Sequence, residues 1–304
     1  MKYLVLDIGG SSIKYALMNR ESEFLEKGKV KTPKDSLETF VEVIGEIYDI
    51  YKDKIEGIAI SMPGRIDSDR GYTFTGGALT YNDKRDMVDI LKKRCPTSIT
   101  IENDGKCAAL AEASLGNLSD CNDGIVVILG TGIGGGIIKD KKLHKGADFI
   151  AGEFSVIMTS SNTKKNPMES MWARTCGVNA LINEVASVKN ISEEEINGEK
   201  VFEYANSGDK EVLEILDEYC YKIVVQLFNL QYIYNPKKIA IGGGISAQNI
   251  LIEYIQKNIH ELASMIPVDF PAPTVVACKF RNDSNLIGAL QNFIRKVISE
   301  RRYK

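Results

Sequence analysis

The chain contains the stretch VVILGTGIGGGIIK at residues 126–139, in which two apolar runs flank a turn rich in glycine. A similar arrangement, DIGGSSIKYAL, occupies residues 7–17. In both stretches an apolar run enters the turn and another leaves it, which predicts a strand, a tight turn and a second strand. We infer an internal duplication of a βββαβα-like unit, with one glycine turn in each half of the chain.

The first stretch also matches the dinucleotide-binding spacing G-x-G-x-x-G through Gly130, Gly132 and Gly135. That fingerprint requires a helix directly after the glycines, because the pyrophosphate lies at the helix N-terminus. Here the apolar pair Ile137 and Ile138 follows, which indicates a strand. The context therefore argues against an NAD-dependent oxidoreductase.

Beyond the two turns, helical and extended patterns alternate along the chain, as expected of an α/β protein. Apolar residues recur at helical spacing in two long segments, and shorter apolar runs ending at glycine or proline predict strands. The predicted helices are 36–52, the second part of 98–116, 209–236, the segment after Gly244, and a closing helix with a basic, frayed end; the predicted strands include 55–64, the first part of 98–116, KKIAIGG and 274–280.

Composition excludes several classes of function. The chain has 304 residues with 38 basic and 41 acidic side chains, and this net charge of −3 offers no basic face for nucleic acid. No apolar run approaches the roughly 20 residues that span a bilayer, so we expect a cytoplasmic protein without a membrane partner. Six scattered cysteines without a C-x-x-C pair, and only two histidines, argue against zinc and disulfides.

Glycine-rich turns can bind phosphate, because an absent side chain lets several backbone N–H groups converge on the oxygens at close range. Three turns have this composition. They comprise Asp7, Ile8, Gly9, Gly10, Ser11 and Ser12 in the first, Gly130, Thr131, Gly132, Gly134 and Gly135 in the second, and Gly242, Gly243 and Gly244 in the third.

The chain resembles the ROK family of bacterial sugar kinases and repressors in six motifs, which follow one another along nearly its whole length: DIGGSSIKYAL, PGRID, ENDGKCAALAE, LGTGIGGGIIK, AGE and NPKKIAIGGGIS. The resemblance implies a two-domain actin-like ATPase fold of the ribonuclease-H-like, hexokinase type, with ATP, Mg²⁺ and a sugar in the interdomain cleft. It implies a sugar-binding lobe at 1–118, completed by the C-terminal helix 286–304, and a nucleotide-binding lobe at 119–285.

The resemblance also implies roles for individual residues. Asp104 is the general base for the sugar 6-hydroxyl, although the residue could instead serve only as a helix N-cap. Asp7 holds Mg²⁺ through water, and the three glycine turns listed above bind ATP. The predicted sugar-binding residues are Gly64, Gly77, Asn103, Asp104 and Glu153, whereas Lys14 is expected to lie outside the site.

The sequence departs from the family pattern after Glu153. Where the family continues Glu-x-Gly-His, this chain continues with Phe154, Ser155 and Val156. The cysteine-rich zinc loop is also missing, with Cys176 at most a remnant, so we expect no zinc. Without the histidine the sugar remains open between glucose, N-acetylmannosamine, N-acetylglucosamine and a β-glucoside.

Two further questions stay open at this point. Family repressors carry a DNA-binding module before the first glycine turn, and only six residues precede Asp7, which favours a kinase. The alternative is a non-catalytic, sugar-sensing regulatory protein with the same pocket. Family members are often homodimers, but no interface pattern stands out in the sequence.

Overall fold

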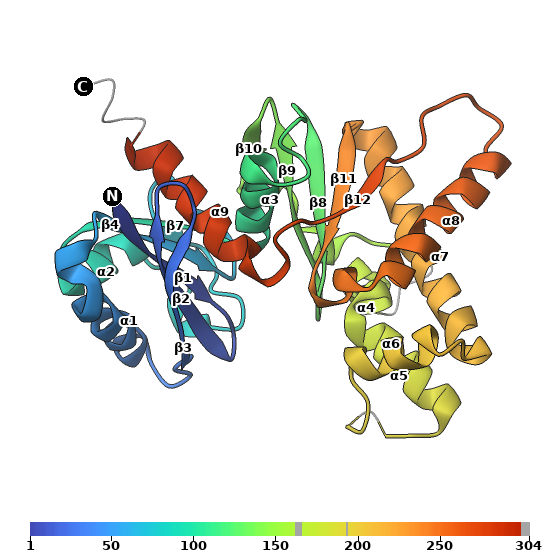
Figure 1. The fold of residues 1–304 in the computed structure, drawn as a ribbon, viewed down its shortest axis with the longest axis horizontal. Coiled ribbons are helices and arrows are strands. Elements are labelled where there is room, and N and C mark those ends of the chain that lie inside the picture. Colours follow the sequence, from blue (N-terminus) through green and yellow to red (C-terminus); the bar gives the residue numbers. More distant parts are fainter. Residues whose placement is uncertain (162–165, 193, 299–304) are drawn as a thin grey trace. The chain divides into compact units, whose positions relative to one another are not determined.

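The computed structural model describes residues 1–161, 166–192 and 194–298, which form an α/β fold with two five-stranded sheets (Figure 1). The chain divides into two compact units. The first consists of Met1–Ser114, Leu143–Ala151 and Asp283–Lys304, and the second of Leu115–Lys142 and Gly152–Asn282. The basic end predicted for the closing helix falls on residues 299–304, outside the described residues.

The sheet of the first unit has the strand order β3-β2-β1-β4-β7. Strands β1 and β2 are joined by the first glycine turn, and β1, β4 and β7 run parallel. Nearly all residues of β1 and β4 are buried, as expected of strands covered on both faces. The strands are β1 (Lys2–Ile8), β2 (Ser12–Asn19), β3 (Phe24–Lys31), β4 (Gly57–Met62) and β7 (Ser98–Asn103).

The α-helices of the described residues in this unit are α1 (Leu37–Tyr51), α2 (Met87–Arg94), α3 (Asp104–Leu115) and α9 (Ser284–Phe293), which continues as a π-helix over Ile294–Ile298. Helix α9 packs on β1, β4 and β7, although it comes from the far end of the chain (Figure 1). A small sheet of β5 (Ile66–Asp67) and β6 (Tyr72–Thr73) was not predicted, because its strands are too short to show alternation.

The sheet of the second unit has the order β10-β9-β8-β11-β12. Its strands are β8 (Gly124–Leu129), β9 (Ile133–Lys139), β10 (Lys142–His144), β11 (Lys238–Gly242) and β12 (Val275–Ala277). Strand β9 pairs antiparallel with β8, begins directly after Gly132 and includes Ile137 and Ile138, so the prediction of a strand at this point is confirmed. The geometry is incompatible with the dinucleotide fingerprint, which needs a helix there.

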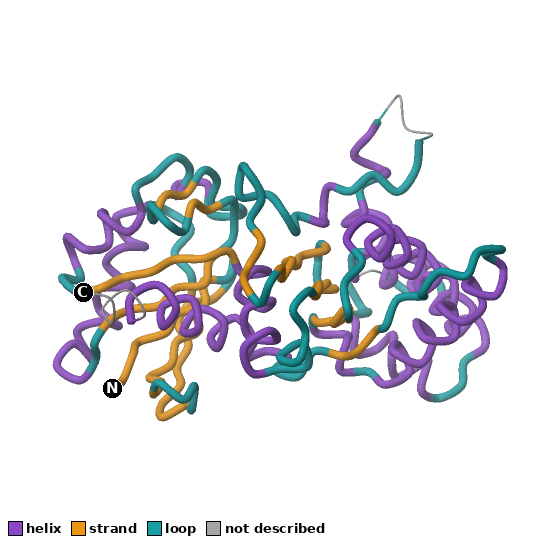
Figure 2. The backbone as a smooth tube through the Cα atoms, turned by 90° about the horizontal axis from the view of Figure 1, so that it is seen from above, coloured by secondary structure: helices purple, strands orange, loops and turns teal. Residues whose placement is uncertain are grey.

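Both sheets therefore have the same strand order, with three consecutive strands at one side and two later strands added in parallel. Figure 2 shows the strands of the described residues in orange and the helices in purple. The matching strand orders confirm the duplication inferred from the two glycine turns. The βββαβα unit itself was one strand too short, because β7 and β12 each add a parallel strand at the sheet edge.

The second unit differs from the first by a large helical insertion before β11. The insertion contains α4 (Trp172–Cys176), α5 (Val178–Lys189), α6 (Gly198–Asn206) and α7 (Lys210–Tyr234), whereas α8 (Asn249–Met265) follows β11. Helix α7 was predicted from its periodicity and ends at Asn235 in a left-handed conformation just before Pro236. Helices α4 to α6 were not predicted, and neither α4 nor α5 has a capping side chain that would mark its start.

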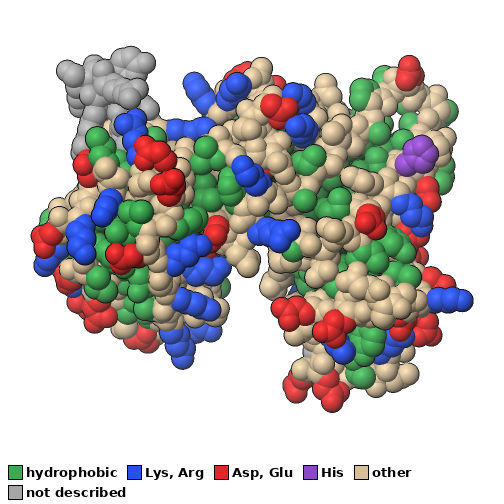
Figure 3. Space-filling view, viewed as in Figure 1, with side chains coloured by type: hydrophobic (Ala, Val, Ile, Leu, Met, Phe, Trp, Pro, Cys, Tyr) green, Lys and Arg blue, Asp and Glu red, His purple; other side chains and the backbone are tan. Residues whose placement is uncertain are grey.

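Charged side chains of both signs are interspersed over the face of the molecule shown in Figure 3. Among the described residues, no helix combines the length and the apolar character needed to cross a membrane.

Gly288 allows α9 to pack against α3. A Cβ at Gly288 would lie 1.7 Å from the carbonyl oxygen of Cys107, closer than atoms can approach. We predict that Gly288→Ala lowers the free energy of unfolding by about 1–3 kcal/mol, the usual cost of overpacking. Circular dichroism during urea unfolding measures the change. The control is Gly244→Ala, because nothing lies within 4 Å of a Cβ at Gly244; equal stability of the two variants contradicts the prediction.

Candidate functional site

The carboxyl ends of the parallel strands β1, β4 and β7 bring polar side chains together in the first unit. Asp7 pairs in register with Ser61, and the next residue of β4, Met62, pairs with Asn103. Ligands of parallel α/β sheets bind at this edge, beyond the carboxyl ends of the strands. The predicted residues Asp7, Asn103 and Asp104 thus share one edge of one sheet.

Asn103 links three parts of this edge through its side-chain amide. Its Oδ1 accepts a hydrogen bond from the backbone N–H of Lys106 at 3.1 Å, which caps α3. Its Nδ2 donates to the carbonyl oxygen of Gly64 and to Oδ1 of Asp104, both at 3.0 Å. Asn103 thus makes a cap bond at the start of α3, one residue before Asp104.

Asp104 is the first residue of α3. Its Oδ1 accepts hydrogen bonds from Nδ2 of Asn103 and from the backbone N–H of Gly105 at 2.8 Å. Both bonds fix the orientation of the carboxylate. The start of a helix also favours a negative charge, because the backbone dipoles point their positive ends there.

Gly64 and Gly77 face each other in two loops beside Asn103. Both have positive φ angles, 105° and 60°, which side chains rarely adopt. A Cβ at Gly64 would lie 2.0 Å from the carbonyl oxygen of Thr75, so the loops can pack this closely only with glycine. The Cβ of the next residue, Ala78, would lie 3.7 Å from a Cβ at Gly10. The structure thus brings the first glycine turn, the two loops and Asn103 together.

Asp7 is buried and surrounded by donors that the sequence did not reveal. Its Oδ1 accepts hydrogen bonds from Ser61 Oγ at 3.1 Å and from Asn285 Nδ2 at 3.0 Å. Lys14 Nζ lies 4.0 Å from its Oδ2, since the two residues are paired across β1 and β2. Burial raises the pKa of the Asp7 carboxyl, while Asn285, Lys14 and Ser61 act in the opposite direction. Lys14, expected outside the site, therefore lies next to a predicted site residue.

The first glycine turn keeps backbone donors available. Gly9 N–H donates to the carbonyl of Ser12 at 3.0 Å, and Thr32 binds the Gly9 carbonyl through its hydroxyl. The N–H groups of Gly10 and Ser11 find no acceptor within residues 1–161, 166–192 and 194–298. Such exposed N–H groups suit a phosphate oxygen.

The second glycine turn, between β8 and β9, also keeps backbone N–H donors available. Gly130 N–H donates to the carbonyl of Gly132 at 3.0 Å, whereas Thr131 and Gly132 donate to no acceptor in the described part of the chain. Gly135 has a packing role, because Phe154 and the Val126 carbonyl occupy the space of its side chain. A Cβ added at Gly134, on the same strand, would make only ordinary van der Waals contact.

The third turn follows β11. Gly243 has φ of 96°, and a Cβ there would lie 2.0 Å from the Leu129 carbonyl oxygen, so β8 and the turn touch at this point. Gly244, in contrast, faces open space at the edge of a cavity of about 330 Å³. The lining residues are Asn197, Gly198, Glu199, Phe202, Gly244, Ile245 and Gln248.

Glu153 begins a short 3-10 helix, Phe154–Val156, in the second unit. Gly152 before it has φ of 86° and packs on Gly136. Ser155 Oγ donates to the carbonyl of Ile133 at 2.9 Å, which ties this segment to the second glycine turn. Val156, which replaces the family histidine, is 57% exposed.

Sequence reasoning missed a polar network behind Asn103. Glu102 is fully buried, and its carboxylate accepts hydrogen bonds from the Asn103 N–H at 3.0 Å and from Ser68 Oγ at 2.7 Å. Lys145 Nζ donates to Ser68 Oγ at 2.7 Å and lies 3.8 Å from Glu102. Lys145 follows Glu102 by 43 positions in the numbering, so no local pattern could have revealed this pair.

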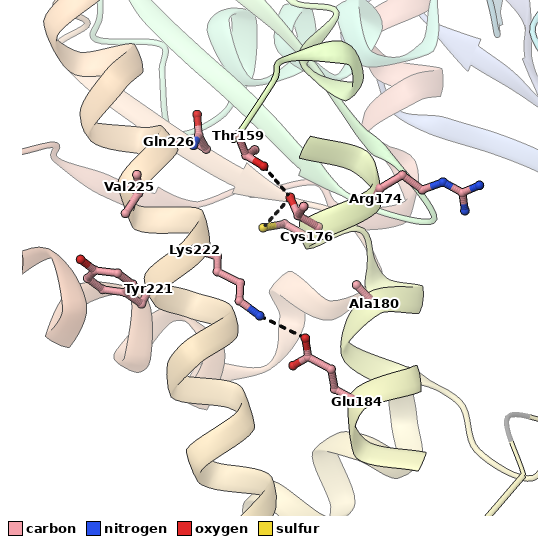
Figure 4. Close-up of a pocket in the computed structure, with 10 residues that line it drawn as sticks. Thr159, Arg174, Cys176, Ala180, Glu184, Tyr221, Lys222, Val225 and Gln226 are labelled. Carbon is pink, nitrogen blue, oxygen red and sulfur yellow. Dashed lines mark hydrogen bonds and ion pairs between the residues drawn. The ribbon is translucent and has the colours of Figure 1, made fainter. Parts of the chain in front are cut away.

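A cavity of about 440 Å³ lies between α4, α5 and α7 in the second unit (Figure 4). Lys222 and Glu184 form an ion pair of 3.0 Å at its wall. Burial raises the pKa of the Cys176 thiol, the possible remnant of a zinc loop. No cluster of three or more metal-binding His, Cys, Asp or Glu side chains occurs in the part of the chain that the structure describes.

Comparison with known proteins identifies the family. The family model described as "ROK family" matches residues 3–296, nearly the whole chain. The chain belongs to the ROK family.

Among ROK relatives, the β-glucoside kinase of Listeria monocytogenes is 28% identical over 297 residues, covering 97% of this chain and 98% of that protein. The β-glucoside kinase of Klebsiella pneumoniae is 28% identical and covers 96% of both chains. A ROK family protein from Streptococcus pneumoniae TIGR4, solved in complex with sucrose, has a TM-score of 0.88 at 25% identity and covers 99% of this chain and 100% of its own.

These findings confirm the predicted ROK family and its actin-like ATPase fold. The names of the relatives agree with the prediction of a carbohydrate kinase and not of an oxidoreductase. The roles of the individual site residues in this ROK chain remain predictions.

The Asn103 amide offers a direct test of the site's architecture. We predict that Asn103→Ala lowers the free energy of unfolding by about 1–3 kcal/mol, since it removes a helix cap and the bond to Gly64. Urea unfolding measures the loss. The matched control is Asn197→Ala, which removes the cap of α6, a bond to the Lys200 N–H, at a cost of about 1 kcal/mol. A smaller loss for Asn103→Ala than for Asn197→Ala contradicts the prediction.

Proposed function

We propose that the protein is an ATP-dependent sugar kinase, which transfers a phosphoryl group to the 6-hydroxyl of a hexose, an N-acetylhexosamine or a β-glucoside. The observation that carries the proposal is the arrangement of Asp104, whose carboxylate is held by Asn103 and Gly105 while Asn103 makes the helix cap. The kinase names of the relatives support it.

In this proposal Asp104 accepts the proton of the 6-hydroxyl. The O6–phosphorus bond forms as the bond between the γ-phosphorus and the bridging oxygen breaks, and ADP leaves with that oxygen. Asn103 and the loops of Gly64 and Gly77 orient the sugar, and Glu153 binds hydroxyls near C1 and C2. Positioning and proton acceptance are the main contributions that a protein makes to phosphoryl transfer.

The N–H groups of Gly10, Ser11, Thr131 and Gly132 find no acceptor among the described residues. They support the assignment of ATP phosphates to the two turns, Gly9, Gly10, Ser11 and Ser12 in the first and Gly130, Thr131 and Gly132 in the second. The exposed hydroxyls of Ser11 and Thr131 add further donors. The cavity beside Gly244 is suited to adenosine, because the bare backbone allows a flat base and ribose to approach.

Mg²⁺ would be held at Asp7. A single carboxylate whose Oδ1 already accepts two hydrogen bonds fits an ion that keeps most of its water shell and contacts the protein at few points. When bound, Mg²⁺ neutralises charge on the phosphates. The hydrogen bonds from Ser61 and Asn285 fix the orientation of the Asp7 carboxylate.

The rival function is a sugar-sensing regulatory protein that binds the same ligand without chemistry. A coupled ADP-release assay with glucose, N-acetylmannosamine, N-acetylglucosamine and cellobiose separates the two functions. Sugar-stimulated ADP release is expected with at least one sugar. Protein that binds ATP and a sugar but releases no ADP contradicts the kinase and favours the regulator.

We predict that Asp104→Asn lowers kcat by about 10²–10⁴-fold, because an amide of the same shape cannot accept the proton. The sugar dissociation constant, measured by calorimetry, is expected to change much less. The control is Asp89→Asn, which removes an exposed carboxylate from α2. Retained turnover in Asp104→Asn contradicts the assigned role.

We predict that Gly244→Leu raises the KM for ATP at least tenfold, because the new side chain enters the cavity assigned to adenosine. The KM for the sugar is expected to stay within threefold. The matched control is Ala247→Leu, which adds a similar side chain to an exposed position of the same 3-10 helix, Gly244–Ala247. Equal ATP KM values for the two variants contradict the adenosine assignment.

A further inference from the structure

Three partly exposed aromatic rings cluster in the first unit, with the Tyr72 ring edge-on to Phe74 at an interplanar angle of 78°. Tyr72 and Phe74 have ring centroids 5.1 Å apart, and Phe74 and Phe149 have centroids 6.1 Å apart with an interplanar angle of 32°. The Arg65 guanidinium lies over the Phe74 ring, 4.0 Å from its centroid. We call Tyr72, Phe74 and Phe149, together with Arg65, the aromatic shelf.

The aromatic shelf is built on the loops that hold Asn103. Arg65 directly follows Gly64, whose carbonyl accepts the hydrogen bond from Asn103. Phe74 N–H donates to the Arg65 carbonyl at 2.8 Å, and Arg65 N–H donates to Thr75 Oγ1 at 3.0 Å. The shelf is therefore continuous with the loops proposed to bind the sugar.

Phe149 is held in a strained conformation. Its φ is 61°, in the left-handed region that a bulky side chain rarely adopts. Its loop is closed by a hydrogen bond from Ala151 N–H to the Lys145 carbonyl, and Lys145 is anchored to Ser68 and Asp69. The surrounding contacts thus maintain an energetically costly backbone that presents the ring beside Phe74, and such strain is concentrated at functional sites.

Arg65 supplies unused polar groups at the same surface. Its guanidinium makes no hydrogen bond or ion pair with any residue that the structure describes, and its Nε is a buried donor without an acceptor. A buried donor without an acceptor destabilises the folded protein, and a ligand that accepts its hydrogen bond removes this cost. Stacking on Phe74 fixes the plane of the guanidinium.

These properties match the chemistry of a second sugar ring. A pyranose has a flat face of C–H groups, which packs on aromatic rings, and a rim of hydroxyls, which accept N–H bonds. One N-acetyl group is too small to cover the apolar surface of three rings, whereas a second sugar ring is larger. A β-linkage leaves O1 equatorial, so a second ring extends in line with the first, and its C–H face can pack on Phe74 and Phe149, whose ring planes are 32° apart.

We propose that the aromatic shelf binds the second ring of a β-linked disaccharide, whose non-reducing glucose is the phosphorylated unit. This inference rests on the proposed kinase function and selects the β-glucoside among its substrates. Phe149 is the residue that sets the preference for a substituted O1.

The test compares wild type with Phe149→Gly, which removes the ring and relieves the positive φ, so the variant is expected to fold. The ratio of kcat/KM for cellobiose to that for glucose is expected to fall at least tenfold. Phe149→Trp keeps a flat ring and is expected to keep most of the ratio. The control Phe270→Ala removes an exposed ring of the second unit and is expected to leave the ratio unchanged.

Calorimetric titration with cellobiose, maltose and glucose, without nucleotide, tests the shelf independently of turnover. Wild type is expected to bind cellobiose more tightly than maltose or glucose, and Phe149→Gly to lose at least tenfold in cellobiose affinity. Equal losses for cellobiose and glucose, or no preference for cellobiose in wild type, overturn the shelf. If Phe149→Gly loses cellobiose affinity but the wild type phosphorylates no sugar, the aromatic shelf stands and only the kinase proposal is overturned.

Discussion

The side-chain amide of Asn103 makes three hydrogen bonds on which the rest of the candidate site depends. One caps α3, one holds the Gly64 loop, and one orients Asp104. Behind it, the fully buried Glu102 accepts the Asn103 N–H and Ser68 Oγ. A buried carboxylate is costly unless it is paired and hydrogen-bonded, and here Lys145 and Ser68 satisfy that condition. The position of Asp104 is thus determined by a buried polar network.

The two units have the same sheet topology but different chemistry at their strand ends. In the first unit, the parallel strands end in Asp7, Glu102 and Asn103, with Asp104 following at once. In the second, Gly130 follows β8 and β11 ends in Gly242, and the backbone itself provides the donors and the open space beside Gly244. Both units therefore offer backbone donors in a glycine turn, but only the strand ends of the first unit add the carboxylates of Asp7 and Asp104, which illustrates that function depends on the site and not on the fold.

The proposed specificity has a separate physical origin. Phe149 maintains a left-handed backbone because Lys145 anchors one end of its loop and Phe74 packs against its ring. The anchor reaches the same Ser68 that binds Glu102. One polar network therefore supports both the position of Asp104 and the position of the aromatic shelf.

The sequence by itself determined the strand-turn-strand duplication, the long helices and the family, because glycine turns and apolar periodicity are local patterns. It placed Asp7, Asn103 and Asp104 at strand ends, but it missed α4, α5 and α6 and assigned Lys14 elsewhere. Only the tertiary structure decided that Asn103 binds the Gly64 carbonyl, that Asn285 binds Asp7 across 278 positions, and that Phe149 meets Phe74. Such contacts depend on strand register and helix packing between distant segments, which no local pattern encodes.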